Sequence, residues 1–211
     1  KYFAFQCHDV LEYQAKPNLM DTFSNDASMQ MKVAIDSTVI YNTFSNGSSS
    51  NKGATAGVKS GSYNLGTDTT PVTLTASNIL QSITALSSVL DEANVPETDR
   101  WLVITPTERQ ILMQSNLAQA QFMGDATSVL RNGKIGMIDR FTVYVSNNLY
   151  TASSKWTIMS GTRDAISFAS QITNVETLRS TTTFGNIMRG LNVFGFKVVK
   201  PEALVTAVVT K

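Results

Sequence analysis

The sequence KPNLMDTFSNDASMQMKVAIDSTVIYN, residues 16–42, is a long stretch with one helical pattern. Apolar and small side chains recur in it at steps of three and four residues, as on one face of an α-helix. These residues are Met20, Phe23, Ala27, Met31, Ala34 and Thr38. Pro17 suits a first helical position, so we expect the helix to begin there. From Asn18 to Asn42 it spans about 37 Å, whereas a compact chain of this size has a radius of gyration of about 17 Å. The stretch predicts the spine of an elongated or flat molecule, with an ordinary core helix as the alternative.

Residues 45–66, SNGSSSNKGATAGVKSGSYNLG, are rich in Ser, Gly and Asn and nearly lack large apolar groups. Such a segment buries too little surface to offset the entropy lost on ordering. We therefore expect a mobile surface loop between two structural units. Its glycines do not follow the order of a phosphate-binding loop.

The segment after this loop has a mixed α/β pattern. One helical face is expected in residues 75–94, with Thr75 as its N-cap, and the helix ends at Asn94-Val95-Pro96. RWLVIT, residues 100–105, predicts a strand that is buried on both faces. A capping box from Thr105 to Glu108, with proline at the first helical position, opens a helix through about Leu117. The face residues of the first helix are Ile79, Ile83, Leu86, Leu90 and Ala93.

Strands dominate the rest of the chain. Asn132-Gly133 predicts a tight turn that leads into an alternating strand at 141–145. From Arg163 on, four strand-like stretches follow, and TFGNIMRG, residues 183–190, predicts a short helix among them. The four stretches are AISFAS, NVETLRS, LNVFGFKVV and ALVTAVV. Together with the helices, this pattern predicts a small α/β unit followed by a strand-rich C-terminal third.

The composition excludes several classes of function. Charged residues make up 16% of the 211 residues, below the roughly 25% of a usual soluble domain. The net charge of +1 gives no electrostatic case for attraction to nucleic acid or membrane, and no apolar run approaches the ~18 residues of a membrane-spanning helix. One cysteine, Cys7, rules out an internal disulfide and fits a reducing compartment. A surface of Ser, Thr, Asn and Gln suits coverage by other protein.

The sequence offers no catalytic constellation, so we do not expect an enzyme. His8 and Cys7 are neighbours on a predicted strand and point to opposite faces, so they do not form a nucleophile–base pair. One His and one Cys also fail to supply a zinc ligand set, and no metal or cofactor is expected. Asp91 and Glu92 are interpreted as solvated or capping residues, because no partner lies at a defined spacing. Asp139-Arg140 and Arg163-Asp164 are interpreted as surface ion pairs, and Trp101 and Trp156 as packing residues rather than ligand-stacking rings.

Four stretches give the chain a resemblance to a known family. They are KYFAFQCHDV (1–10), LDEANVPETDRWLVITP (90–106), GKIGMIDRFTVYVSNNL (133–149) and the segment from Val175 to Val209. In this order they resemble the major capsid proteins of tailed bacteriophages, the Johnson-fold capsid family. The resemblance implies an α+β subunit with a long spine helix, a peripheral-domain β-sheet and an α/β axial domain.

The resemblance also implies a division of the chain. Residues 9–64 and 165–200 would form the peripheral domain, with the spine helix, the mobile loop and the long strands. Residues 65–164 and 201–211 would form the axial domain. Residues 1–8 look like the returning strand of an extended loop that reaches over a neighbouring subunit. Its outgoing strand is missing, so we expect that an upstream segment was removed or is not included.

On this reading Tyr2, Phe3 and Phe5 are subunit-interface residues. Phe3 and Phe5 would then bury apolar area across the interface rather than in their own subunit's core. The partners implied are other copies of the chain, in the pentamers and hexamers of an icosahedral shell around double-stranded DNA. Portal, scaffolding and decoration proteins are further possible partners, and neither sequence-specific DNA binding nor a membrane is implied. The protein would reside in the virion after assembly in the host bacterial cytoplasm.

Two other interpretations stay open at this point. An encapsulin-type bacterial nanocompartment uses the same fold to enclose enzymes rather than a genome. An adhesive or ligand-binding domain would also suit the Ser/Thr/Asn content, although it leaves the long helix unexplained.

Overall fold

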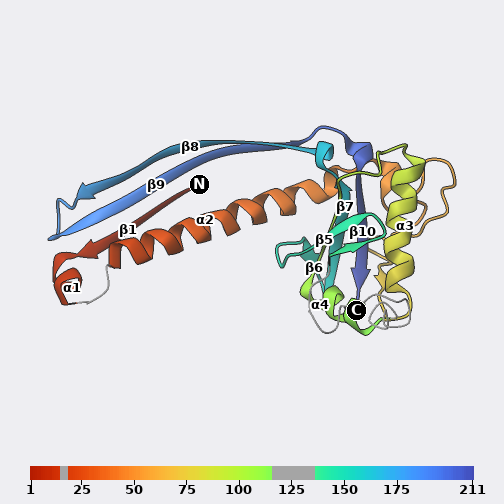
Figure 1. The fold of residues 1–211 in the computed structure, drawn as a ribbon, viewed down its shortest axis with the longest axis horizontal. Helices are drawn as coiled ribbons and strands as arrows, with labels where there is room; N and C mark the ends of the chain where they lie inside the picture. The colour runs from red at the N-terminus through yellow and green to blue at the C-terminus, as the bar shows by residue number, and fades with distance from the viewer. Residues whose placement is uncertain (15–18, 116–135) are drawn as a thin grey trace. The chain divides into compact units, whose positions relative to one another are not determined.

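The structure is a computed structural model that describes residues 1–14, 19–115 and 136–211. The chain divides into two compact units (Figure 1). Unit 1 comprises Lys1–Val39 and Phe168–Phe196, and unit 2 comprises Ile40–Ser167 and Lys197–Lys211. Residues 40–64 thus pack in unit 2, whereas the sequence-based boundary had placed them with the spine helix. Three expected features, the helix start at Pro17, the Asn132-Gly133 turn and the helix end at Leu117, lie outside the described residues.

Unit 1 contains a three-stranded sheet in the order β1-β9-β8 and most of a long helix. The strands are β1 (Tyr2–His8), β8 (Ile166–Arg179) and β9 (Gly185–Val198), and the helices are α1 (Asp9–Gln14) and α2 (Leu19–Thr43). β1 runs antiparallel to β9, from the pair Tyr2↔Leu191 to the pair His8↔Gly185. The 25 residues of α2 confirm the predicted long helix.

The C-terminal strands differ from the prediction in one respect. The short helix expected at 183–190 is wrong, because the chain from Gly185 onward belongs to β9. Pairing with β1 hydrogen-bonds this backbone in extended form, and two glycines disfavour a helix here. The stretches AISFAS and NVETLRS merge into the single 14-residue strand β8.

Unit 2 is built on a sheet in the order β2-β10-β7-β3-β5-β4, with β6 paired to β7. The neighbouring strands β3 and β5 are parallel, whereas β7 runs antiparallel to both β3 and β10. Helices α3 (Ile79–Glu92) and α4 (Pro106–Gln114) belong to the same unit. The strands are β2 (Val72–Thr73), β3 (Arg100–Ile104), β4 (Met137–Ile138), β5 (Phe141–Val145), β6 (Thr151–Ala152), β7 (Lys155–Thr162) and β10 (Leu204–Thr210).

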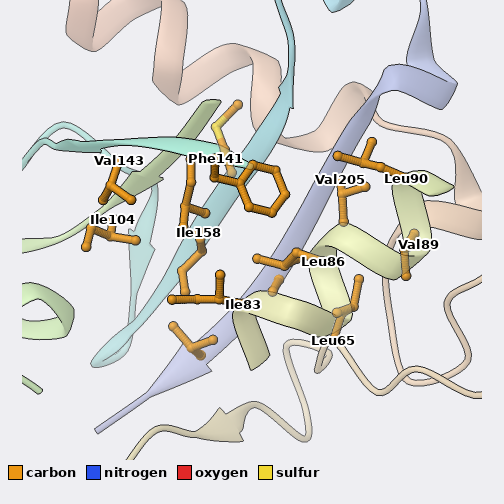
Figure 2. Packing of buried hydrophobic residues seen from close by; sticks show 14 of the residues in the cluster. Leu65, Ile83, Leu86, Val89, Leu90, Ile104, Phe141, Val143, Ile158 and Val205 are labelled. Atoms are coloured by element: carbon orange, nitrogen blue, oxygen red, sulfur yellow. The ribbon is translucent and has the colours of Figure 1, made fainter. Parts of the chain in front are cut away.

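The hydrophobic core lies in unit 2, between α3 and the sheet (Figure 2). The predicted helical face supplies Ile83, Leu86 and Leu90, and alternate residues of β5 supply Phe141 and Val143. Full burial of each such side chain contributes about 1.5–3 kcal/mol. β3 is not buried on both faces as expected, because Trp101 and Val103 are only half-buried.

The two predicted helix starts have different outcomes. The capping box is confirmed, since the Thr105 side chain accepts from the Glu108 amide and the Glu108 carboxylate accepts from the Thr105 amide. Thr75 does not cap α3, whose N-cap is Asn78. The Asn78 side chain accepts from the Thr75 amide and donates to the Thr73 carbonyl. These bonds hold residues 75–78 in a turn, so the helix begins later than predicted.

The loop at 45–66 is anchored, which corrects the expectation of a segment without anchors. Asn51 is buried, and its amide donates to the backbone carbonyls of Glu202 and Leu204. Ala56 and Leu65 are buried in the core cluster. Polar and small side chains therefore fix this loop where large apolar residues are few.

Candidate functional site

The predicted interface residues lie on β1 and alternate between the two faces of the sheet. Tyr2 is 79% exposed and lies directly opposite Leu191, which is 47% exposed, so both side chains share one face. Phe3 and Phe5 lie on the other face and are half-buried. Successive residues of β1 therefore point to opposite faces of the sheet, as in any strand.

Phe3 and Phe5 also pack against their own chain, which the sequence reasoning did not anticipate. Their rings stack with centroids 6.2 Å apart, and the Phe5 ring meets the edge of Phe23 of α2 at 5.8 Å. The Phe3 ring lies over Gly190, where an added Cβ would come within 2.5 Å of it. These contacts hold β1 in place within unit 1. Of the three predicted interface residues, Tyr2 is the one with an exposed ring.

Unit 1 leaves most of its apolar side chains in contact with solvent. Among its described residues, Cys7 is the only hydrophobic one that is buried. The large hydrophobic residues of unit 1 that are exposed are Tyr2, Val10, Leu11, Tyr13, Phe23, Met29, Val33, Phe168, Val175, Leu178, Phe184, Leu191 and Val193. Large contiguous exposed apolar surface marks interaction sites in soluble proteins.

A buried ionic cluster joins α3 to the start of β3 in unit 2. The Arg100 side chain is fully buried and donates to Asp91 Oδ1 at 2.7 Å and to the carbonyls of Val95 and Pro96. Arg140 donates to the other Asp91 oxygen at 2.8 Å. Burial acts to raise the pKa of Asp91, but the hydrogen bonds and charges of Arg100 and Arg140 outweigh it and lower the pKa. The cluster therefore ties the end of α3 and the Val95-Pro96 backbone to the start of β3.

The sequence interpretation of these charges needs three corrections. Asp91 is not simply solvated or capping, because it neutralises a buried guanidinium. Arg140 bonds mainly to Asp91 and Glu97, with Asp139 only at 3.9 Å. Asp164 forms its ion pair with Lys200 rather than with its neighbour in sequence.

Glu108 is the second buried charged residue of unit 2. Its Oε2 accepts from the Thr105 amide at 2.8 Å, and its Oε1 accepts from the indole of Trp156. Burial raises the pKa of Glu108 to about 7, against the effect of these hydrogen bonds. The side chain is 0% exposed, so a substrate in solution does not reach it. Trp156 thus acts as a hydrogen-bond donor within the unit.

The remaining reactive groups do not converge. Cys7 is buried and His8 is exposed, as the alternation along β1 predicts. Across the described ranges 1–14, 19–115 and 136–211, no three His, Cys, Asp or Glu residues come together as a possible metal site. In the same ranges, no helix is both long enough and apolar enough to span a bilayer. The exposed apolar surface of unit 1 is therefore the candidate functional site.

Comparisons with known proteins identify a family for the chain. A family model described as "Phage capsid protein" matches residues 9–207. No curated protein matches the chain significantly.

Solved structures similar to this one include phage proteins and an encapsulin. A chain of Mycobacterium phage Che8 has a TM-score of 0.78 and 25% identity, over 99% of this chain and 69% of that chain. The capsid of cyanophage P-SCSP1u has a TM-score of 0.67 and 15% identity, over 100% and 72% of the two chains. The SrpI encapsulin of Synechococcus elongatus has a TM-score of 0.65 and 11% identity, over 100% and 72%.

Proposed function

Because the chain belongs to the phage capsid protein family, we propose that its copies form the closed icosahedral shell that encloses the double-stranded DNA of a tailed phage. The chain is a structural major capsid protein and a component of the virion. Pentamers and hexamers are the building blocks of the proposed shell, which assembles in the host bacterial cytoplasm.

The observation that carries this proposal is the exposed apolar surface of unit 1. A unit with Cys7 as its only buried hydrophobic residue among those described gains little stability from its own core. Burial against neighbouring copies contributes roughly 25 cal/mol per Å² of apolar surface. Each contact needs to reach only about the millimolar range, ~4 kcal/mol, because repetition around a closed symmetric assembly holds the shell together.

The two compact units correspond to the two domains of a capsid subunit. Unit 1 is the peripheral domain with the spine helix α2, and unit 2 is the axial domain. This assignment moves residues 40–64 to the axial domain, since Asn51, Ala56 and Leu65 pack there. Residues 1–8 are the strand of an extended loop.

Tyr2, Phe3 and Phe5 form part of the contact between copies. Tyr2 is the sharpest probe, because its ring is 79% exposed and contacts no other aromatic ring of the described residues. We expect Tyr2→Ala to weaken shell formation and to leave subunit melting unchanged. Phe5→Ala removes the contact with Phe23, so it lowers subunit melting as well as assembly. If Tyr2→Ala assembles as the parent does, Tyr2 lies outside the contact.

The role is structural rather than enzymatic, and the near-neutral charge of +1 suits it. A subunit with little net charge has no strong attraction to the DNA phosphates, so the genome is enclosed without sequence-specific binding. Portal, scaffolding and decoration proteins are the other partners that a shell of this kind would have.

The experiment that tests the function is to purify the complete gene product and measure its size. We expect closed shells in the megadalton range by light scattering and electron microscopy. A stable monomer close to the 23.0 kDa of this chain would contradict the proposal.

An encapsulin-type compartment is the second candidate, and the fold similarity to the SrpI encapsulin supports it. The contents of purified particles distinguish the two. We expect nuclease-protected DNA, whereas a co-purified cargo protein in DNA-free particles would favour the encapsulin. The match of the capsid family to residues 9–207 leaves the adhesive-domain interpretation without support.

A further inference from the structure

Glu108 is a carboxyl group in the core of unit 2 that no basic side chain of residues 1–14, 19–115 or 136–211 neutralises. It is 0% exposed, and within the described part of the chain it forms no ion pair. Its two oxygens accept one hydrogen bond each, from the Thr105 amide of its own helix start and from Trp156 of β7. The carboxyl therefore links α4 to a central strand of the sheet.

The surroundings of Glu108 give its charge little solvation. It lines a cavity of about 20 Å³, which is enough for about one water molecule. The other described residues that line the cavity come from 64–74, α3, β3, β7 and β10, and none of them is titratable. Arg109 follows Glu108 on α4, and Lys155, which precedes Trp156, donates its ammonium to the Asp68 carbonyl.

The charged and the neutral form of the Glu108 carboxyl each meet only one of two requirements, hydrogen-bond partners for all polar groups and no charge in the core. The carboxylate accepts both N–H groups but places a negative charge among aliphatic side chains, which is costly. The neutral acid removes that charge, but its O–H needs an acceptor. Because neither state is strongly preferred, a change in pH near neutrality is enough to move the group between them.

We propose that Glu108 is a proton-binding site that couples the stability of unit 2 to pH across the neutral range. Burial raises the pKa of this carboxyl from 4.5 to about 7 in the folded chain. Between these two values the folded chain holds a proton that the unfolded chain has lost, so folding takes up a proton. Unit 2 therefore gains stability as the pH falls from above 7 toward 4.5. This inference does not depend on shell formation, because it concerns the subunit itself.

Trp156 provides a direct readout, since its indole donates to the carboxylate. The chain has two tryptophans, so Trp101→Phe leaves Trp156 as the sole emitter. We expect its fluorescence to titrate with a midpoint near pH 7, and the thermal midpoint of unit 2 to fall as pH rises through the same range. Glu108→Gln removes both effects. Glu202→Gln, an exposed acid of the same unit, keeps both.

The following outcomes overturn the inference. One is a protein with Glu108 intact that shows no transition on either side of pH 7. Another is a transition that persists in Glu108→Gln, which would reveal a different group. If Glu108→Gln does not fold, Trp156→Phe takes its place. Trp156→Phe removes a hydrogen-bond donor that favours the carboxylate, so the pH at which thermal stability changes moves above 7. An unmoved pH midpoint also overturns the inference.

Discussion

Removal of the Asp91 carboxylate tests the energetic role of the buried ionic cluster. Arg100 has a fully buried side chain, and Asp91, which is 39% exposed, is its only ion-pair partner among the described residues. Asp91→Ala leaves the guanidinium buried with only its hydrogen bonds to the carbonyls of Val95 and Pro96 and to Ser87.

The magnitude follows from this geometry. Breaking a buried ion pair by removing one partner costs about 3–5 kcal/mol. Because Asp91 is partly solvated and three carbonyls, of Ser87, Val95 and Pro96, still accept from Arg100, we expect the low end of that range, ~3 kcal/mol. At a denaturant dependence of ~2 kcal/mol per molar urea, the unfolding midpoint of unit 2 falls by about 1.5 M.

Glu97→Ala is the matched control. Glu97 is 69% exposed and binds Arg140 at the surface, so we expect a cost of about 0–1 kcal/mol. Urea titration of unassembled subunits, followed by circular dichroism, measures both variants. Equal midpoints for the two would refute the reasoning, since the carbonyls alone would then suffice to hold Arg100.

The same pair has a pH signature. The pKa of Asp91 lies below its ordinary value of 3.8 in the folded chain, so its stabilisation is present above that value and is lost as pH falls through the folded pKa. We expect Asp91→Ala to lose less stability on acidification than the parent.

Three substitutions test the loop that precedes α3. Gly66 has φ +78°, and an added Cβ would lie 2.2 Å from the Val208 carbonyl oxygen, so we expect Gly66→Ala to abolish native melting of unit 2. Gly53→Ala, at φ +88° with nothing within 4 Å, should cost only about 1–2 kcal/mol of backbone strain. Asn51→Ala removes two buried hydrogen bonds, and we expect a loss of about 1–3 kcal/mol with faster proteolysis at 52–62. Unchanged proteolysis would mean that other contacts hold the loop.

Local signals predicted the parts of the fold that depend on neighbours in sequence. Helix α2 was visible in its three- and four-residue steps, β5 in its alternation, and the start of α4 in the Thr105–Glu108 spacing. The alternation also placed Cys7 and His8 on opposite faces of β1. Each of these features is decided within a few residues of chain.

The features that sequence reasoning missed depend on residues far apart in the chain. Asn51 holds its loop through carbonyls more than 150 positions away, and Arg140 reaches Asp91 across 49 positions. Trp156 meets Glu108 across 48 positions. The start of β9 looked helical because its partner strand, β1, lies at the other end of the sequence. The residue pattern within a short stretch of sequence does not reveal such long-range pairings.

The sparse burial in unit 1 has a consequence for the fate of copies that find no neighbours. Since Cys7 is the only described hydrophobic residue buried there, the stability of unit 1 rises with the concentration of its partners by mass action. A lone copy opens more often and offers extended, apolar chain to proteases and chaperones. Copies that contact one another bury this apolar chain and are protected from both. Host proteases and chaperones would then remove surplus and damaged subunits without a dedicated signal, because only subunits that fail to associate stay exposed to them.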